Sequence, residues 1–288
     1  MAERRDRIGI GWRAELSASI YTHLDRIDCI ELIADDHFRA SQRQLRALRT
    51  LAGQVPMLLH GVTAGLAGAA PIEEQRLERM ARLLEAVQPE SWSEHLAFVR
   101  AGGVEIGHLA APPRRAEGIE AAARNIRRAT AITGMAPAME NVATLIDPPC
   151  STIDEPSWIT GVLGLSDAPL LLDLHNLYAN AVNFGADPAA MLLQLPLDRV
   201  RAVHVSGGHW IAEPDGSGAR LLDDHVHDVP EAVFALLTLL GHHAPRPLDV
   251  ILERDGQFPA FGRLMAQLDA TRAALAAGRD AAKLKAVA

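Results

Sequence analysis

Histidine, carboxylate and asparagine side chains recur in this sequence at the ends of short apolar runs. They are His60, Glu94, His95, Glu140, Asn141, Asp173, His175, Asn176, His204, Glu253 and Asp255. An isolated charge in a dry pocket is costly, so carboxylates and imidazoles that share such a pocket need compensation. A divalent cation supplies it, and sets of His and carboxylate without a cysteine ligand suit iron, manganese or zinc. The pattern predicts a metal site, although any one of these histidines can instead cap a neighbouring carbonyl group.

A further set of metal-ligand types lies in the segment 221–230, LLDDHVHDVP. If this segment is extended, alternate side chains point to one side, so that Asp223 and His225 bind the same ion, with His227 two residues further on. The strand-end residues offer roughly four histidines and four carboxylates, which is more than one ion uses. We therefore expect about two or three metal ions, linked by a bridging glutamate.

The elements that would position these residues are apolar runs, most of them rich in β-branched residues or leucine, as buried parallel strands are. The runs lie at 8–12, 29–34, 56–61, 92–98, 136–142, 170–176, 201–207 and 249–255. Helical patterns lie between them, at 73–88, 116–132, 187–195 and 230–241. Strands that alternate with helices form right-handed βαβ units and a parallel sheet. The pattern predicts an α/β fold, a (β/α)8 TIM barrel, in which the carboxyl ends of all strands meet on one face.

The length of 288 residues suits one such barrel, which takes about 250 residues. We expect a single domain over residues 1–288, with a closing helix and a frayed, Ala- and Lys-rich tail from about residue 260. The Gly- and Pro-rich stretch at 207–220 is expected to be a long loop over the active face. It matches no glycine-rich nucleotide-binding motif.

Composition argues against several classes of protein. A net charge of −8 with no long basic run disfavours a nucleic-acid partner, whose recognition depends on clustered Lys and Arg. The only cysteines, Cys29 and Cys150, are too few for a disulfide-rich scaffold or a four-cysteine zinc site. The charged N-terminal region lacks the apolar stretch of a signal peptide, and no run of about 18 apolar residues predicts a membrane span. We therefore expect a cytoplasmic protein without a membrane partner.

Seven short motifs occur in an order that is typical of one family. They are HGV at 60–62, SEHLAF at 93–98, MEN at 139–141, LLLDLHNLYANAVNFGADP at 170–188, HVSG at 204–207, DDH at 223–225 and LERDGQFP at 252–259. In these motifs the chain resembles the multinuclear non-heme iron-dependent oxidative enzymes, which include the methanobactin-biosynthesis oxygenase. The resemblance extends from Ile8 to about residue 265 and implies a (β/α)8 barrel, in agreement with the apolar runs.

The resemblance implies an activity, its cofactors and its partners. Members of the family hold two or three iron ions, as a mixed Fe(II)/Fe(III) set, and use dioxygen to rearrange residues, often cysteines, in ribosomally made precursor peptides. A ferric ion would hold the substrate thiolate or carboxylate, and such coordination deprotonates a thiol. A small partner protein that captures the leader of the peptide is implied as well. The implied ligands are His60, His95, Glu140, Asp173, Asn176, His204, Asp223, His225 and Glu253, with Glu140 bridging two irons.

Other polar residues near these motifs are candidates for contacts to the ligands or to the substrate. They are Arg13, Glu94, Asn141, His175, His209, His227 and Asp255. Two of them mark departures from the family. His175 stands where the family commonly has the first of two adjacent asparagines, and the additional glycine in HVSGGHW leaves open whether His209 occupies the usual place.

Two other functions are compatible with a barrel fold but fit this sequence less well. A xylose isomerase-like sugar isomerase or phosphodiesterase also surrounds its metals with His, Asp and Glu. A sugar isomerase usually needs a lysine near the metals, which the strand-end runs lack, and the acidic charge disfavours a nuclease of this kind. A non-catalytic barrel with a decayed site predicts lost ligands, yet every run from the third to the eighth keeps at least one.

Overall fold

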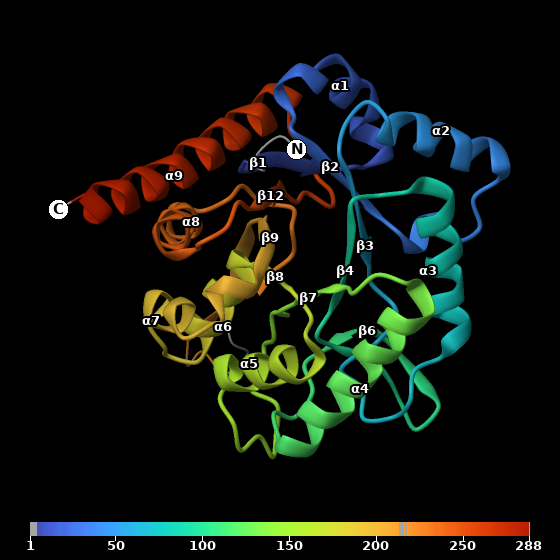
Figure 1. Ribbon diagram of the computed structural model, residues 1–288. Helices are drawn as coiled ribbons and strands as arrows, with labels where there is room; N and C mark the ends of the chain where they lie inside the picture. Colours follow the sequence, from blue (N-terminus) through green and yellow to red (C-terminus); the bar gives the residue numbers. More distant parts are fainter. Residues whose placement is uncertain (1–4, 213–215, 217, 288) are drawn as a thin grey trace.

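The computed structural model describes residues 5–212, 216 and 218–287 of the chain. Its centre is a closed barrel of parallel strands, in the neighbour order β1-β12-β9-β8-β7-β4-β3-β2. These strands are β1 (Arg7–Gly11), β2 (Cys29–Ile33), β3 (Met57–Gly61), β4 (Ser91–His95), β7 (Ala138–Glu140), β8 (Leu170–Asp173), β9 (Val200–Val205) and β12 (Asp249–Leu252). Figure 1 shows the strands in the middle of the molecule and the helices around them. The expected TIM barrel is confirmed.

Helices cover the outside of the barrel and connect successive strands. They are α1 (Ser17–Thr22), α2 (Gln42–Ala52), α3 (Glu74–Val87), α4 (Ala116–Thr133), α5 (Glu155–Ser166), α6 (Leu174–Asn183), α7 (Pro188–Leu193), α8 (Glu231–His243) and α9 (Phe261–Val287). Short 3-10 turns occupy Ala14–Leu16, Leu24–Arg26, Asp35–His37 and Leu197–Arg199. The closing helix expected from about residue 260 is α9, which continues through the Ala- and Lys-rich stretch and packs against α8.

Several apolar runs extend beyond the strands that they contain, because the chain turns at the rim of the barrel. The run at 170–176 is one example, since β8 ends at Asp173 and α6 begins at the next residue. The Asp173 carboxylate caps this helix by accepting a hydrogen bond from the backbone N–H of Asn176 at 2.6 Å. His175 and Asn176 therefore lie in the first turn of a helix rather than in a strand.

Two antiparallel hairpins stand at the rim. One pairs β5 (Phe98–Ala101) with β6 (Val104–Ala110), and the other pairs β10 (Gly208–Ala212) with β11 (Ala219–Asp223). The stretch at 207–220, expected to be a long loop, is in its described part a hairpin whose two flanks pair as strands. Residues 213–215 and 217 of that stretch lie outside the described residues.

Buried aliphatic side chains fill both the barrel and the layer between strands and helices. Leu171 and Ala202 pack with Ala138, and Cys29 packs with Leu58 and Ile251. Cys29 is thus a core residue, as its apolar run indicated. Among the described residues, no helix combines the length and hydropathy that crossing a membrane requires.

Candidate metal centre

The carboxyl ends of the barrel strands bring seven acidic and histidine side chains to one face. They are Glu31 on β2, His60 on β3, His95 on β4, Glu140 on β7, Asp173 on β8, His204 on β9 and Glu253 directly after β12. Each is more than nine-tenths buried. Burial of so many ionisable groups at one place is costly unless they compensate one another or bind cations.

His60, His95 and Glu140 form the first group. Oε2 of Glu140 lies 3.3 Å from Nε2 of His60 and 3.2 Å from Nε2 of His95. Ligand atoms that bind one metal ion at about 2.1 Å lie roughly 3 Å from one another. Oε2 of Glu140 nevertheless makes no hydrogen bond to a described residue. The three atoms thus face one another as the ligands of a common ion do.

Neighbouring groups orient the two imidazoles of this group. Nδ1 of His60 is 2.8 Å from the hydroxyl of Ser93, and that hydroxyl donates to the carbonyl of Leu59 at 3.5 Å. Nδ1 of His95 is 3.2 Å from the carbonyl oxygen of Gly61. Hydrogen bonds of this kind at Nδ1 leave Nε2 as the metal-binding atom and fix the orientation of the ring.

His95 lies between two carboxylates, because Glu94 approaches its Nδ1 and Glu140 its Nε2. Burial by itself lowers the pKa of His95, but the carboxylates of Glu140 and Glu94 outweigh burial and raise this pKa to about 9. Without metal, His95 is therefore an imidazolium at neutral pH. Glu94 is also fixed by the backbone, since it accepts hydrogen bonds from the N–H groups of His95 and Ala64.

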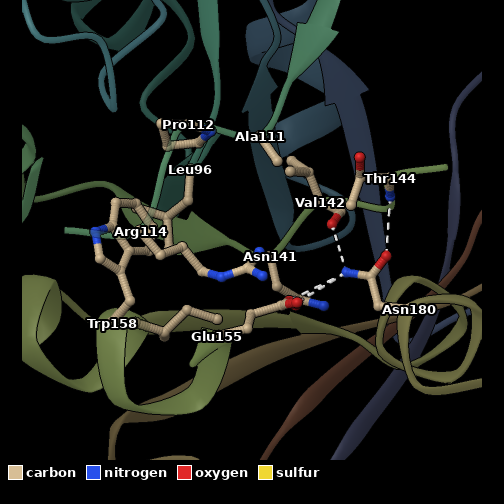
Figure 2. Close-up of a pocket in the computed structure, with 11 residues that line it drawn as sticks. Leu96, Ala111, Pro112, Arg114, Asn141, Val142, Thr144, Glu155, Trp158 and Asn180 are labelled. Atoms are coloured by element: carbon tan, nitrogen blue, oxygen red, sulfur yellow. Dashed lines mark hydrogen bonds between the residues drawn. The ribbon is translucent and has the colours of Figure 1, made fainter. Parts of the chain in front are cut away.

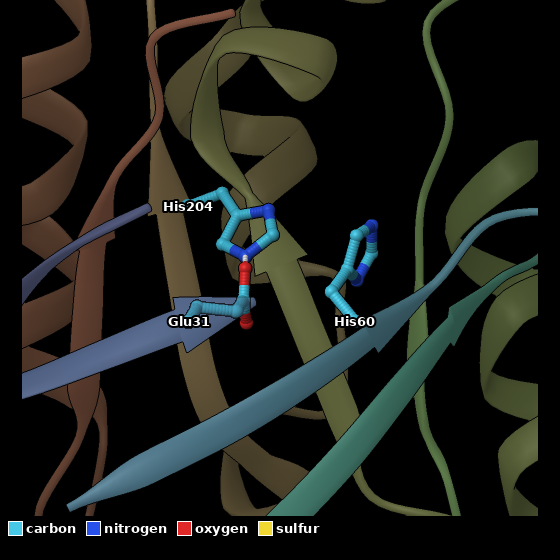
Figure 3. A group of neighbouring side chains, drawn as sticks. All are labelled: Glu31, His60 and His204. Carbon is cyan, nitrogen blue, oxygen red and sulfur yellow. Dashed lines mark ion pairs between the residues drawn. The ribbon is translucent and has the colours of Figure 1, made fainter. Parts of the chain in front are cut away.

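His204 is the centre of the second group. Its Nε2 lies 2.8 Å from Oε2 of Glu31, as Figure 3 shows, and its Nδ1 lies 3.2 Å from Oε1 of Glu140 and 3.1 Å from Oε2 of Glu253. Burial lowers the pKa of His204, but the surrounding carboxylates outweigh it and raise the pKa well above its ordinary value. Glu140 contacts His60 and His95 through one oxygen and His204 through the other. It thus has the position of a bridging ligand.

Asp223 and His225 form the third group, at the end of the β10–β11 hairpin. Oδ2 of Asp223 is 3.0 Å from Nε2 of His225, and Oδ1 is 2.7 Å from Nδ1 of His175. Nδ1 of His225 is 3.3 Å from Oε2 of Glu253, which connects this group to the second. The condition that this segment is extended throughout is not met, because His225 has a φ of 54° in the left-handed region. A turn, rather than strand alternation, brings Asp223 and His225 together.

Asp173 and Asn176 complete the buried set. Asp173 forms a group with Glu140, His204 and Glu253, and one ligand atom from each of these four residues lies within 4.8 Å of the others. Burial, and then the charges of Asp223 and Glu140, raise the pKa of Asp173 well above its usual range. Oδ1 of Asp173 caps α6, which leaves Oδ2 as the atom available to a cation.

Asn141 has a different role from the ligands. Its Oδ1 accepts a hydrogen bond from the backbone N–H of Asp173, and its Nδ2 donates to the carbonyl of Asp173, both at 2.9 Å. Its own carbonyl accepts from Nδ2 of Asn176 at 3.0 Å. Asn141 therefore fixes the ends of β7 and β8 relative to each other and orients both neighbours.

Arg13 and Asp255 lie together at the edge of the centre. The guanidinium of Arg13 donates hydrogen bonds to Oδ1 of Asp255, and Oδ2 of Asp255 is 3.2 Å from Nδ1 of His225. Arg13 thus neutralises a carboxylate that orients His225. That Arg13 also contacts a substrate carboxylate stays a prediction.

His209 and His227 lie beside Asp224 and not beside the expected ligands. Both contact Asp224, and neither has a polar contact to any of the nine expected ligands within the described chain. The positive φ at His225 turns the chain, so residues of the same segment point to different places. His209 and His227 therefore make no direct contact to the expected ligands among the described residues, and that either contacts the substrate stays a prediction.

Several buried atoms of the centre have no hydrogen-bond partner among the described residues. They are Oε2 of Glu140, Oδ2 of Asp173, Oδ1 of Asn176 and Nε2 of His175, His204 and His225. Proteins rarely leave buried polar atoms unsatisfied, and each exception calls for an explanation such as an ion. The nitrogen and oxygen donors here fit divalent or trivalent metal ions, and their overlapping groups fit more than one.

A cleft of about 660 Å³ leads from this centre to the surface. At its inner end lie His95, Glu140, Asn176, Asp223 and His225. Its outer walls are mostly apolar and come from β6, the segment 142–149 and β11. A cleft of this size and character holds a small molecule or a few residues of a peptide.

A second, smaller cavity lies beside the cleft, and its network appears in Figure 2. Nδ2 of Asn180 donates to both oxygens of Glu155, each at 3.1 Å, and to the carbonyl of Val142 at 2.9 Å. Oδ1 of Asn180 accepts from the N–H of Thr144. Burial raises the pKa of Glu155 to about 7, against the opposing effects of Arg114 and Asn180. The network fixes the start of the segment that follows β7 and lines the cleft.

Sequence comparison agrees with this geometry. The sequence profile of the family described as "RiPP precursor modification enzyme MbnB/TglH/ChrH" matches residues 7–276. The chain belongs to this family. It is 36% identical over 278 residues to a UPF0276 protein of Streptomyces avermitilis, an alignment that covers 93% of this chain and 54% of that protein. A UPF0276 protein of Acaryochloris marina is 30% identical over 260 residues, with 90% of this chain and 91% of that protein covered. The chain thus spans about half the length of the Streptomyces relative.

Solved structures with the same fold are much more distant in sequence. An L-ribulose 3-epimerase has a TM-score of 0.60 at 14% identity, with 98% of this chain and 97% of that chain covered. Endonuclease IV from Thermus thermophilus has a TM-score of 0.58 at 15% identity, with 93% of this chain and 98% of that chain covered. At these identities the similarity establishes the barrel alone.

Three residues in or beside the centre of this MbnB/TglH/ChrH-family member were missing from the expected set. Glu31 is a carboxylate inside a buried apolar run, the same signal that Glu140 and Glu253 give, and it could have been included on that ground. Ser93 orients His60 from the neighbouring strand, which no local pattern reveals. Asp224 is adjacent to Asp223 but contacts His209 and His227, a difference that depends on the turn.

Proposed function

We propose that this protein uses a multinuclear iron centre and dioxygen to modify oxidatively a residue of a ribosomally made precursor peptide, and that this residue is a cysteine. Family membership supports the peptide substrate. The resemblance to iron-dependent enzymes supports two or three irons as a mixed Fe(II)/Fe(III) set. We further propose that a small partner protein binds the leader of the peptide.

The observation that carries the proposal is the set of overlapping ligand groups at the barrel mouth. Glu31, His60 and His204, then His60, His95 and Glu140, and then Glu140, Asp173, His204 and Glu253 form groups within 4.8 Å. They share members, so ions bound to them would be neighbours. A site of this kind, with imidazole and carboxylate but without cysteine ligands, suits non-heme iron.

Each group of the centre would hold one part of the metal cluster. His60, His95 and Glu140 would hold one ion, and Glu140 with His204 and Glu253 a second. Asp173, Asn176, Asp223 and His225 would hold the third or complete the second. When bound, the iron ions supply one-electron chemistry with dioxygen and favour the thiolate form of a substrate cysteine.

The residues around the centre would bind and orient the peptide. The apolar walls of the cleft exclude water from its inner end and fit the apolar part of an extended peptide. Asp223 and His225 lie where this cleft meets the ligands, so they would place the reacting side chain beside the metals. The Arg13–Asp255 pair holds His225 in position from the opposite side.

The sugar isomerase alternative lacks its expected carbonyl-polarising residue. The only lysines of the chain are Lys283 and Lys285, and both belong to the last turns of α9. No ammonium group therefore reaches the centre to polarise a sugar carbonyl. The phosphodiesterase alternative would need cations around the cleft, whose lining contains no Arg or Lys among the described residues.

The proposal is tested by iron loading and a peptide assay. The protein is reconstituted anaerobically with Fe(II), and its metal content is measured together with the mass of a cysteine-containing precursor peptide encoded near its gene, before and after exposure to air. We expect about two or three irons per chain and an oxygen-dependent mass change at a cysteine.

A pair of variants provides the control. His60→Ala removes a ligand of the first group and should lose both iron and activity. His242→Ala changes an outer residue of α8 and should retain both. Retention of only zinc or magnesium after reconstitution, or turnover of the peptide without oxygen, would contradict the proposal.

A further inference from the structure

A second cluster of metal-ligand types lies outside the centre, and the function proposed above does not use it. It consists of His209, Asp224 and His227, whose ligand atoms lie within 4.8 Å of one another. Nδ1 of His209 is 2.6 Å from Oδ2 of Asp224, and Nδ1 of His227 is 3.0 Å from Oδ1. The two imidazole rings lie 5.0 Å apart, tilted by 40°. Two histidines thus direct the same ring atom at opposite oxygens of one carboxylate.

Close backbone packing produces this arrangement. A Cβ atom at Gly207 would lie 2.2 Å from the carbonyl oxygen of Asp228, and one at Gly208 would lie 2.0 Å from that of Leu222. Only glycines allow such an approach at both positions. Gly207 brings the chain before β10 against His227 and Asp228, and Gly208 brings the start of β10, and with it His209, against Leu222 on β11. These two glycines form the GG pair of HVSGGHW.

The carboxylate of Asp224 has no competing cation. Within the described parts of the chain, no Arg or Lys lies at ion-pairing distance from it, and its other contact is the backbone N–H of Val226, which donates to Oδ1 at 3.0 Å. The next carboxylate, Asp228, is different because Arg254 and Arg263 pair with it. Among the described residues, the two imidazoles are therefore the only side chains that contact the carboxylate of Asp224.

The cluster is also accessible to ions from solvent. The side chains of His209 and His227 are each 43% exposed, whereas that of Asp224 is 17% exposed. Two imidazoles and one carboxylate, with open positions left for water, form a common binding set for divalent transition metals. Each residue offers one ligand atom within 4.8 Å of the other two, a spacing from which small side-chain rotations reach bonds of about 2.1 Å to one ion.

We propose that His209, Asp224 and His227 bind one divalent transition-metal ion, such as Zn²⁺, separately from the centre at the barrel mouth. The ion takes the place of the protons that join the two imidazoles to the carboxylate. It ties the start of β10 to the turn after β11. Asp223 ends β11 and His225 lies in this turn, so the ion holds in place the part of the chain from which the centre takes its third group.

Zinc titration of the iron-loaded protein tests the proposal. Zn²⁺ is added anaerobically in competition with a coloured chelator, and bound zinc and iron are measured after gel filtration. We expect the wild type to bind one Zn²⁺ more than the double variant His209→Ala/His227→Ala, with the same iron content in both. The single variants His209→Gln and Asp224→Asn should weaken zinc binding by more than about 100-fold, because even indirect partners of a metal contribute 10–100-fold.

The paired histidines His242 and His243 are a matched control. Their rings lie 4.7 Å apart, and within the described chain no carboxylate pairs with either. The variant His242→Ala/His243→Ala should bind zinc as the wild type does. In the same samples, Zn²⁺ should protect His209 and His227, but not His242 and His243, from acylation by diethylpyrocarbonate as read by peptide mass spectrometry.

These results separate the peripheral site from the centre. The variant His60→Ala should lose iron while retaining the Zn²⁺ that depends on His209, so a failure of the proposed function leaves this test intact. Equal zinc binding by the wild type and the His209→Ala/His227→Ala variant would overturn the proposal. Loss of one iron for each Zn²⁺ bound, or absence of protection at His209 and His227, would overturn it as well.

Discussion

Ser93→Ala is the sharpest test of how the first group is oriented. When a metal ion binds Nε2 of His60, the proton of the imidazole lies on Nδ1 and is donated to the Ser93 hydroxyl, which is 2.8 Å away. The hydroxyl passes its own proton toward the carbonyl of Leu59. This chain of donors fixes the tautomer that a metal requires. The alanine variant removes it without changing any ligand.

The structure sets the size of the effect. His60 is 3% exposed and Ser93 is 4% exposed, so the Nδ1–H group of the variant has no access to bulk water. An unsatisfied buried donor costs about 1–3 kcal/mol. Without metal, His60 can carry its proton on Nε2, toward Glu140, and avoid most of this cost. The penalty therefore falls on the metal-bound state, where it corresponds to a roughly 10–100-fold loss of affinity.

The assay compares Fe(II) affinity and thermal stability in wild type and variant. Affinity is measured by anaerobic competition with a chelator, and stability by melting with and without iron. We expect Ser93→Ala to bind iron about 10–100-fold more weakly and to lose more stability with iron than without it. Ser91→Ala is the matched control, because Ser91 lies two residues earlier on β4 and removes a hydroxyl from the other end of the strand.

Iron affinity within twofold of the wild type would refute the reasoning, since His60 would then be held by something other than Ser93. An equal loss of stability with and without iron would refute it too. The hydroxyl would in that case act on the fold and not on the tautomer. Recovery of iron binding by Ser93→Thr would connect the effect to the hydroxyl.

Three further predictions concern charge. Glu140→Gln keeps the volume of the side chain but removes the carboxylate that His60, His95 and His204 share. The iron content, measured by metal mass spectrometry, should therefore fall by at least one ion per chain. Because the pKa of His95 is raised to about 9, its proton must leave before the ion of the first group binds. This one proton should raise the affinity for that ion by about tenfold per pH unit from pH 7 to 9, as chelator competition at each pH would show. The pKa of Glu155 is about 7 when folded and 4.5 ordinarily, so its protonated form stabilises the protein fully below pH 4.5, and this contribution is lost as pH rises through 7. Glu155→Gln should therefore raise the free energy of unfolding at pH 8 by up to about 3 kcal/mol relative to the wild type and change it little near pH 4.5, as denaturant titration would show.

The barrel and most of the buried cluster were predictable because they follow from local chemistry. Glu140 and Glu253 lie inside apolar runs, where a carboxylate has no reason to be unless something pairs with it. Strand ends of a parallel barrel converge, so residues remote in sequence could be placed on one face before any coordinates were known. Helix α5 was not predicted, since Gly161 and Gly164 interrupt its pattern and its N-cap, Asp154, is the main signal.

The segment after β11 shows where sequence reasoning fails. Alternation correctly pairs Asp223 with His225 but for the wrong reason, and it extends the same logic to His227, which the turn at His225 directs elsewhere. The positive φ of His225 determines where these side chains point. Histidine at this position does not indicate such a φ, because this residue type usually has a negative one. The same turn points Asp224 away from Asp223, and Asp224 contacts His209 instead.

Charge balance connects the protonation of the centre to the number of ions it can accept. Nearby carboxylates raise the pKa of His95, His204 and His225, and burial raises that of Asp173, so in the absence of metal each of these four groups keeps its proton to a higher pH than in an exposed peptide. Neutral imidazoles and an ionised Asp173 are the forms that bind metal, so loading must release these protons. Four protons carry the charge of about two divalent ions, and their exchange leaves the buried charge nearly unchanged. A third ion adds charge that the centre itself does not compensate. It is therefore best accommodated together with an anionic substrate group, such as a thiolate, at the inner end of the cleft.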